Sequence, residues 1–321
     1  MPSFVSRRQR RSCDQRKVER VSVTASAPAK INLVLSVGPL REDGYHELAT
    51  MFHAIDRRDT VTVESGPSGS GVTLSVEGEG ADGVPLDDTN LAARAAMILA
   101  QRTGRVADVR IHINKTIPVA GGLAGGSADA AATLVACDAL WGTRMTRTRL
   151  TELAAELGSD VPFSVHGGTM IGRGRGEDLT PVLAHAELTW VIWPNSLGLS
   201  TPTVYAECDR LRGDRLIPSP SIDEAVVSAL RADDPRLLGP LLSNDLQEAA
   251  ISLRPELADV LAEGDGMGAI AGIVSGSGPT TVFLTENEAE AKIMSVKLGI
   301  FYPDSPAFVA RGPAPGARLE D

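Results

Sequence analysis

The chain has 321 residues and a mass of 33.7 kDa, which is enough for one large domain or two of medium size. Its formal net charge is −10 and its pI is about 5.1, which argues against a nucleic-acid binder or a partner of anionic membranes. No apolar run approaches the roughly 18 residues of a membrane span.

The first twenty residues differ from the rest, with seven Lys or Arg against two Asp or Glu. They lack the apolar segment of a secretory signal peptide, and nothing in them could form a core. We expect 1–20 to be a disordered extension or the product of a misplaced start codon. A nucleic-acid-binding arm and a targeting segment are the alternatives. The widely spaced Cys13, Cys137 and Cys208 predict neither a disulfide framework nor a zinc site, which favours the cytoplasm.

Alternating apolar residues predict that the first part of the fold is rich in strands. Segments 21–25 and 28–35 predict two strands with a bend at Pro28. Segments 61–64 and 72–76 predict a hairpin, because a turn rich in Gly, Ser and Pro separates them.

Helical patterns begin further along the chain. The cap-type residues 87–90 precede an Ala/Leu-rich helix that we expect to end near Gly104. A strand is predicted over 109–113 and a helix over 127–140. From Leu150 onward, apolar residues at i, i+3, i+4 and i+7 predict another helix.

The second half of the sequence predicts helices packed on a sheet. Strands are expected at 188–193, 269–274, 281–284 and 306–311, and helices after Thr201, twice within 221–263, and over 286–298. No repeat of fixed period is present. The order of elements predicts an α+β protein with two lobes.

Segment 118–131 is the most informative, because it places four glycines and a serine between a strand and an alanine-rich helix. Glycine permits positive φ, and the amides of a helix start attract anions. This combination suits a polyphosphate, with a tight turn or flexible linker as the alternative. No Gly-Lys-Ser/Thr closes the loop and no Gly-x-Gly-x-x-Gly spans 120–126, so it is neither a Walker A nor a Rossmann loop.

Segment 118–128 resembles the phosphate loop of the GHMP kinases, which has the pattern Pro-x-x-x-Gly-Leu-x-x-Ser followed by small residues. Segments 28–33 and 274–279 resemble the N-terminal and C-terminal motifs of that family in order and spacing. Three motifs over about 250 residues are far more specific than one.

Three further segments, 41–48, 158–163 and 243–246, narrow the resemblance to the branch that phosphorylates a cytidine diphosphate-linked methylerythritol. The resemblance covers 22–312 and implies ATP-dependent phosphorylation of the 2-hydroxyl, a step of non-mevalonate isoprenoid precursor synthesis, by a monomer or homodimer. The alternatives are another kinase of the family, of the mevalonate or homoserine type, and a nucleotide-binding regulator without catalysis.

The resemblance also implies how the chain is divided. It predicts a ribosomal-protein-S5-like, ATP-binding lobe over 21–182 and a ferredoxin-like lobe over 183–312. Segment 313–321 is then expected to be a tail.

Lys30 and Asp160 are the candidate catalytic pair. The residues alone predict a helix cap for Asp160 and a solvated strand charge for Lys30. The resemblance instead implies that Asp160 is the catalytic aspartate and that Lys30 keeps its carboxylate ionised, with Asn32 in the same cluster. Proton removal and mere orientation of the hydroxyl both remain open for Asp160, because phosphoryl transfer needs little help from a base.

The resemblance implies that ATP, with Mg²⁺, lies on the glycine loop. The loop residues expected to hold ATP are Pro118, Val119, Ala120, Gly121, Gly122, Leu123, Ala124, Gly125, Gly126, Ser127 and Ala128. Ser127 would offer its hydroxyl to a phosphate or to Mg²⁺, and the alternative is a plain helix N-cap. Asn90 and Lys115 are expected on the adenine side.

Three alanines of the loop depart from the family pattern. Ala120 and Ala124 stand where relatives often have glycine, and we expect their methyl groups to be tolerated if these residues keep negative φ. Ala128 stands where relatives often have serine, which removes one hydroxyl from the phosphate site.

On the acceptor side, the resemblance implies that Tyr45 stacks on cytosine, His46 hydrogen-bonds it and Tyr205 covers the other face. Thr201 and Asn32 are also expected to bind the substrate. The alternative is that both tyrosines pack in the core. The five histidines show no metal-ligand spacing, so no histidine metal site is predicted.

Overall fold

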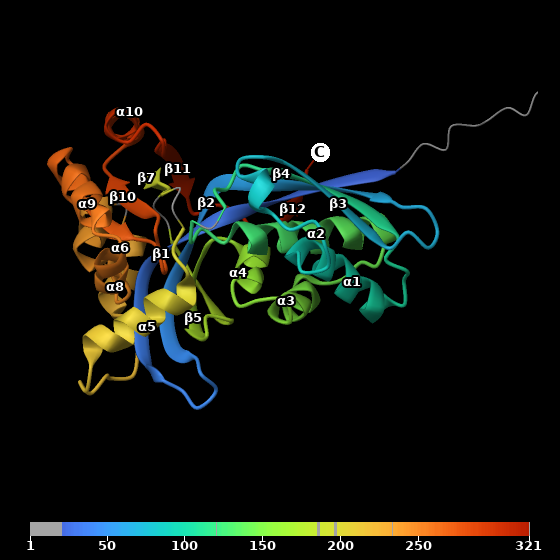
Figure 1. The fold of residues 1–321 in the computed structure, drawn as a ribbon, viewed down its shortest axis with the longest axis horizontal. Helices are drawn as coiled ribbons and strands as arrows, with labels where there is room; N and C mark the ends of the chain where they lie inside the picture. Colours follow the sequence, from blue (N-terminus) through green and yellow to red (C-terminus); the bar gives the residue numbers. More distant parts are fainter. Residues whose placement is uncertain (1–20, 120, 185–186, 196–197, 233, 321) are drawn as a thin grey trace, which may run out of the picture.

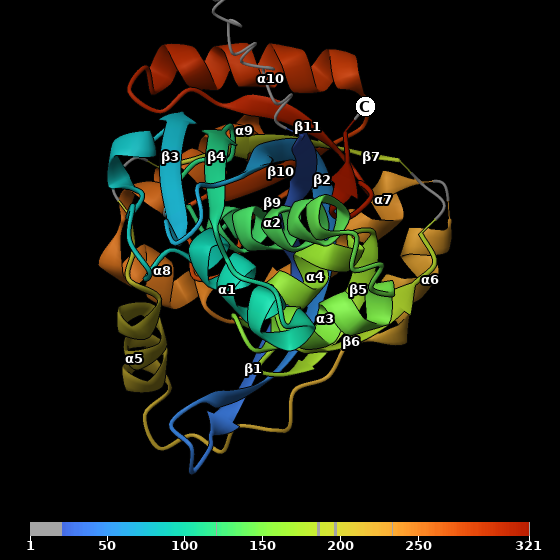
Figure 2. The same cartoon turned by 90° about the vertical axis from the view of Figure 1, so that its right-hand side faces the viewer.

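A computed structural model of the chain describes residues 21–119, 121–184, 187–195, 198–232 and 234–320. Figures 1 and 2 show two lobes: a long sheet with helices α1 to α4 on one face, and a smaller sheet with its own helices. The predicted α+β class with two lobes is confirmed. Among the described residues, no helix is long and apolar enough to cross a bilayer.

The first lobe is built on the larger sheet. Its strands are β1 (Ser22–Leu40), β2 (His46–Ser65), β3 (Val72–Gly78), β4 (Val109–Lys115), β5 (Thr169–Gly174), β6 (Asp178–Val182), β8 (Ser243–Asn244) and β12 (Arg318–Leu319). The order is β12-β1-β2-β4-β3, with β5 also beside β2. The two strands expected over 21–25 and 28–35 form the single strand β1. Pro28 has no N–H to donate to β2, and a register shift directly after it lets the pairing continue.

The hairpin predicted between 61–64 and 72–76 is wrong. Strand β4 lies between β2 and β3, antiparallel to the first and parallel to the second. The alternating residues Val109, Ile111 and Ile113 of β4 are buried, whereas β3 alternates between half-buried and exposed positions. The strand with the more apolar face therefore takes the central place, and β3 forms the edge.

Helices of the first lobe follow the predicted signals closely. They are η1 (Ala81–Gly83), α1 (Leu91–Thr103), α2 (Gly125–Trp141), α3 (Arg147–Ala155) and α4 (Val161–His166). Asn90 caps α1 by accepting from the Ala92 amide at 2.8 Å, and Gly104 and Gly142 end α1 and α2 in the left-handed conformation. Helix α2 packs on both long strands of the sheet.

The second lobe has the βαββαβ order and antiparallel sheet β11-β7-β10-β9 of a ferredoxin-like fold. Its strands are β7 (Leu188–Trp193), β9 (Ala271–Val274), β10 (Thr281–Thr285) and β11 (Phe308–Gly312), and its helices are α5 (Thr201–Arg212), α6 (Glu224–Arg231), α7 (Pro235–Leu238), η2 (Gly239–Leu241), α8 (Gln247–Leu253), α9 (Glu256–Gly266) and α10 (Glu288–Phe301). Region 221–263 thus contains more and shorter helices than the two predicted.

The residues after β11 return to the first lobe. Ala314 and Ala317 are buried, and β12 pairs antiparallel with β1. Segment 313–320, expected to be a tail, is therefore packed on the first sheet.

His53 joins the two lobes. It is fully buried in β2, where Nδ1 lies 2.8 Å from Thr169 Oγ1 and the ring lies 5.9 Å from that of Trp190 in β7. A Cβ at Gly312 of β11 would come within 2.3 Å of Nε2, so glycine is required there. Burial lowers the pKa of His53 to about 3, against a smaller opposing effect of the Gly312 backbone.

This buried histidine should make the fold sensitive to acid. Below pH 6.5 the unfolded chain takes up a proton at His53 that the folded chain does not, so stability falls as the pH falls. Between pH 6.5 and 5 we expect a loss of about 2 kcal/mol, at about 1.4 kcal/mol per pH unit. Urea denaturation at both pH values should show a loss about 2 kcal/mol smaller for His53→Gln. Equal losses would mean that His53 is protonated in the folded chain.

Candidate active site

Two adjoining hollows lie where the lobes meet. The first, of about 500 Å³, is lined by the glycine loop after β4 and by Gly276 and Ser277 of the second lobe. The second, of about 650 Å³, lies beside the β1–β2 turn and α5. The residues that line both are Leu48, Ser159, Arg175, Thr201 and Tyr205. These shared residues make the two hollows continuous.

Contacts with both lobes shape the glycine loop. The carbonyl of Leu123 accepts from the amide of Lys30 at 3.1 Å. Gly122 has φ +75°, and a Cβ there would lie 3.1 Å from the carbonyl oxygens of Ser275 and Gly278. The loop can therefore touch the second glycine segment only because residue 122 lacks a side chain.

Helix α2 begins earlier than predicted. Its N-cap is Ala124, with φ +58°, so the negative φ on which an unstrained methyl group depends is not found at this alanine. Ser127 is inside the helix and is not its N-cap, and Ala120 lies outside the described residues. The loop residues that line the first hollow are Pro118, Val119, Gly121, Gly122, Leu123, Ala124, Gly125 and Gly126. Neither Ser127 nor Ala128 is among them.

Lys30 and Asp160 come together, although 130 positions separate them. Lys30 Nζ lies 3.8 Å from Asp160 Oδ2, donates to Asn32 Oδ1 at 2.8 Å and lies 5.4 Å from the centroid of the Phe52 ring. The Lys30 side chain is 7% exposed and that of Asp160 is 30% exposed. Asp160 precedes α4 but makes no side-chain cap bond, so its carboxylate is available to the hollow.

Asn32 is held so that its oxygen faces Lys30. Its Nδ2 donates to Thr50 Oγ1 at 2.7 Å, and that hydroxyl donates to the Val34 carbonyl at 2.8 Å. Its backbone amide donates to Ser275 Oγ at 3.3 Å. The side-chain amide of Asn32 therefore fixes the ammonium of Lys30, and its backbone amide connects β1 to the second lobe.

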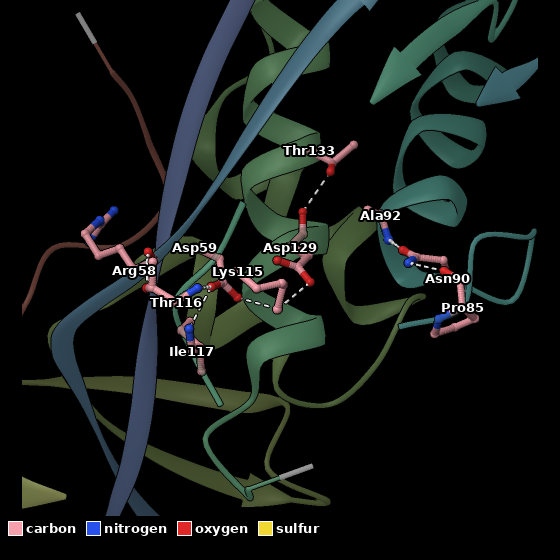
Figure 3. Close-up of polar contacts among 10 residues, drawn as sticks. All are labelled: Arg58, Asp59, Pro85, Asn90, Ala92, Lys115, Thr116, Ile117, Asp129 and Thr133. Atoms are coloured by element: carbon pink, nitrogen blue, oxygen red, sulfur yellow. Dashed lines mark hydrogen bonds and ion pairs between the residues drawn. The ribbon is translucent and has the colours of Figure 1, made fainter. Parts of the chain in front are cut away.

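The two residues expected on the adenine side line the first hollow, but both have structural partners (Figure 3). Asn90 Oδ1 caps α1, and its Nδ2 donates to the Pro85 carbonyl at 2.8 Å. Lys115 Nζ donates to Asp129 Oδ2 at 2.7 Å and to Asp59 Oδ2. Burial lowers the pKa of Lys115, but the two carboxylate charges outweigh it and raise the pKa above its ordinary value.

Asp59 and Asp129 were missed by the sequence analysis. Asp59 Oδ1 also accepts the amides of Thr116 at 2.6 Å and Ile117 at 2.8 Å, so it holds the chain where it enters the glycine loop. Burial raises the pKa of Asp129 to about 7, against the opposing charge of Lys115. For Asp129 the available signal was a carboxylate inside an otherwise small and apolar segment, whereas Asp59 follows Asp56, Arg57 and Arg58 and stands out from its neighbours in no way.

The second hollow brings together the three residues predicted for the base. His46 is buried against Tyr205, with ring centroids 5.1 Å apart and an interplanar angle of 31°. Tyr45 is 54% exposed, so it does not pack in the core. Burial, with a smaller contribution from the charge of Asp160, raises the pKa of Tyr205 and keeps its phenol protonated.

Thr201 and Arg175 lie where the two hollows join. Thr201 Oγ1 is 2.9 Å from Ser277 Oγ of the second glycine segment. The guanidinium of Arg175 lies 5.0 Å from the centroid of the Tyr45 ring. Arg175 stands in the turn between β5 and β6, outside every recognised motif, so the sequence carried no signal for it.

Comparisons with known proteins identify the family of the chain. Family models of the GHMP kinase N-terminal and C-terminal domains match residues 90–168 and 226–304. The 4-diphosphocytidyl-2-C-methyl-D-erythritol kinase of Salinispora tropica is 53% identical over 92% of this chain and 94% of its own length. The chain belongs to the GHMP kinase family. The enzyme of that same name from Thermobifida fusca is 52% identical over 93% of this GHMP kinase and 98% of its own length.

Solved structures of other GHMP kinases share the fold. A crystal structure of 4-(cytidine 5'-diphospho)-2C-methyl-D-erythritol kinase has a TM-score of 0.73 and 35% identity, covering 90% of this chain and 98% of its own. Mevalonate kinase of L. major, solved with R-mevalonate, has a TM-score of 0.75 at 14% identity, covering 92% and 98%. The second likeness concerns the fold alone.

The left-handed Ala124 of this GHMP kinase should carry strain that glycine would relieve. An L-residue there costs about 1 kcal/mol, whereas glycine pays only a larger loss of backbone entropy. We expect Ala124→Gly to raise the unfolding free energy by about 0.5 kcal/mol. Ala128→Gly, inside α2, is the control and should lower it by about 1 kcal/mol. Urea denaturation compares the two, and a loss of stability in both would contradict strain at Ala124.

Proposed function

We propose that this GHMP kinase transfers the γ-phosphoryl group of ATP to the 2-hydroxyl of 4-diphosphocytidyl-2-C-methyl-D-erythritol, in non-mevalonate isoprenoid precursor synthesis. Relatives with that name share 52–53% of residues over more than nine-tenths of the chain. The observation that carries the proposal is the continuity of the two hollows. Lys30 and Asp160 line the first, Tyr45 and His46 line the second, and Tyr205 lines both.

The first hollow fits ATP. Amides of the loop and of the α2 N-terminus suit its phosphates, and Val84, Pro85 and Leu91 offer apolar lining for the adenine. A Cβ at Gly276 would lie 3.5 Å from Lys30 Nζ and would fill space beside the ammonium. The glycine there leaves room for a phosphate next to Lys30.

We propose that Mg²⁺ arrives with ATP, whose phosphate oxygens would supply most of its ligands. Within the described part of the chain, no group of three or more His, Cys, Asp or Glu could hold a metal. Ser127, on the first turn of α2, does not itself line the first hollow, and its role as a protein ligand of the ion stays a prediction. When bound, the ion neutralises charge on the transferred phosphoryl group.

Asp160 and Lys30 would have different roles at the acceptor hydroxyl. Asp160 accepts the hydrogen of the 2-hydroxyl and directs the oxygen at the γ-phosphorus. As the new P–O bond forms and the bond to ADP breaks, the proton passes to the carboxylate. Lys30, 3.8 Å from that carboxylate and held by Asn32, stabilises the negative charge that develops.

Loss of either group should abolish most of the turnover. We expect Asp160→Asn and Lys30→Ala to lower kcat by about 10²-fold or more, since general acid–base catalysis contributes about 10²–10⁴-fold. ADP release measured with 4-diphosphocytidyl-2-C-methyl-D-erythritol checks this. Asp178→Asn, exposed on β6 and outside both hollows, is the control. Near wild-type turnover of either variant, or a preference for mevalonate or homoserine, would defeat the proposal. ATP binding without turnover of any acceptor would favour a regulator.

Arg175 is suited to hold the diphosphate that links the cytidine to the methylerythritol. Of the lysines that line the first hollow, Lys115 is held by two carboxylates and Lys30 lies beside Asp160. Arg175 lines both hollows, is 44% exposed, and pairs only loosely with Glu177, at 3.5 Å. A guanidinium there can bind phosphate oxygens in a bidentate manner.

Removing this guanidinium should weaken acceptor binding alone. We expect Arg175→Gln to raise the KM for the acceptor about tenfold, in line with a charge-assisted hydrogen bond of about 1.5–3 kcal/mol, and to leave the KM for ATP within about twofold. Steady-state kinetics in each substrate measures both constants. Arg173→Gln, exposed on the neighbouring strand and outside both hollows, is the control. An equal rise in the KM for ATP would contradict the assignment.

We further propose a cytoplasmic enzyme that acts as a monomer or homodimer on a small molecule, without nucleic-acid or membrane partners. Cys137 and Cys208 are buried and free, which supports a reducing compartment. The division into lobes at 21–182 and 183–312 remains our proposal.

A further inference from the structure

His46 is held on two sides at the wall of the second hollow. Its Nε2 lies 2.9 Å from Asp209 Oδ1, and its ring packs on that of Tyr205. The His46 side chain is 6% exposed, whereas that of Asp209 is 43% exposed. Asp209 and Tyr205 are four residues apart on α5, so they share one face of the helix. One helix face therefore fixes both the plane and one nitrogen of this imidazole.

The Asp209 carboxylate determines which ring nitrogen carries the proton. A carboxylate only accepts hydrogen bonds, so a neutral His46 must donate from Nε2. Its Nδ1 is then an acceptor, and no hydrogen bond to Nδ1 occurs within the described residues. The arrangement is that of a second residue selecting a histidine tautomer for work on the ring's other side.

We propose that Asp209 is a positioning residue that selects cytosine over uracil by holding His46 as this tautomer. Cytosine carries an amino group at position 4, a donor that an unprotonated Nδ1 accepts. Uracil carries a carbonyl oxygen there, and its lone pairs would face those of Nδ1. The inference rests on the proposed function, because it takes the second hollow to be the base subsite.

The other charged side chains of α5 have partners of their own and do not bind His46. Glu207 pairs with Arg210 and Ser252, and Arg212 pairs with Asp245. Since the Asp209 side chain is 43% exposed, replacing it with an isosteric amide leaves little packing to lose. Its effect should therefore appear in base selection rather than in folding.

Paired acceptors test the inference. Wild type is assayed with the 4-diphosphocytidyl acceptor and with its 4-diphosphouridyl counterpart, and kcat/KM for the cytidine form should be higher by about 100-fold or more. In Asp209→Asn the amide can donate to Nε2 and release the proton to Nδ1. This preference should then narrow by about tenfold or more, through KM for the acceptor, with the KM for ATP unchanged.

Two variants and a spectroscopic measurement distinguish tautomer selection by Asp209 from a purely structural role of this residue. Asp209→Glu keeps an acceptor and should restore most of the preference, and Glu207→Gln on the same helix should leave it intact. ¹⁵N NMR of the imidazole nitrogens should show the proton on Nε2 in wild type and a shift toward Nδ1 in Asp209→Asn.

The outcomes separate the inference from the proposed function. A wild type that prefers cytidine while Asp209→Asn keeps the same preference would overturn the inference alone, as would a proton on Nδ1 of wild-type His46. A wild type inactive on both acceptors would defeat the proposed function, and the inference with it.

Discussion

The buried carboxylate of Asp59 holds the ends of the glycine loop in place. It accepts the amides of Thr116 and Ile117 at the start of the loop and the ammonium of Lys115. That ammonium also reaches Asp129 on α2, beyond the loop (Figure 3). Both ends of the loop are thus attached to β2 through one buried charge cluster. Breaking such a cluster by removing one member costs about 3–5 kcal/mol, so the two ends of the loop are firmly held.

The loop in turn positions Lys30, the proposed catalytic lysine. The carbonyl of Leu123 accepts from the amide of Lys30, and Gly122 lies against the carbonyls of Ser275 and Gly278. Through these contacts the loop sits between β1 and the second lobe. Lys30 is therefore held at two points. Its backbone amide donates to the loop, and its ammonium donates to Asn32.

Local signals predicted the fold better than long-range ones. The helix stops at Gly104 and Gly142 came from the chemistry of single residues, which neighbouring sequence determines. The insertion of β4 beside β2 could not be found this way, because alternation marks a strand but not its partner. The family motifs predicted that Lys30 and Asp160 form a pair, and the chemistry of the two residues alone would not have predicted it. Arg175 belongs to no motif and reaches both hollows only through the fold.

Under the proposed function, helix α5 would connect recognition of the base with placement of the hydroxyl. At its first residue Thr201 contacts Ser277, next to the Gly276 that lies against Lys30. One turn later Tyr205 packs on His46. A base bound against this helix would therefore be held, through a single rigid element, at a fixed position relative to the glycine segment beside Lys30. Binding energy gathered at the base can thus be used to orient the reacting hydroxyl, which is how remote contacts raise the rate of a transfer reaction.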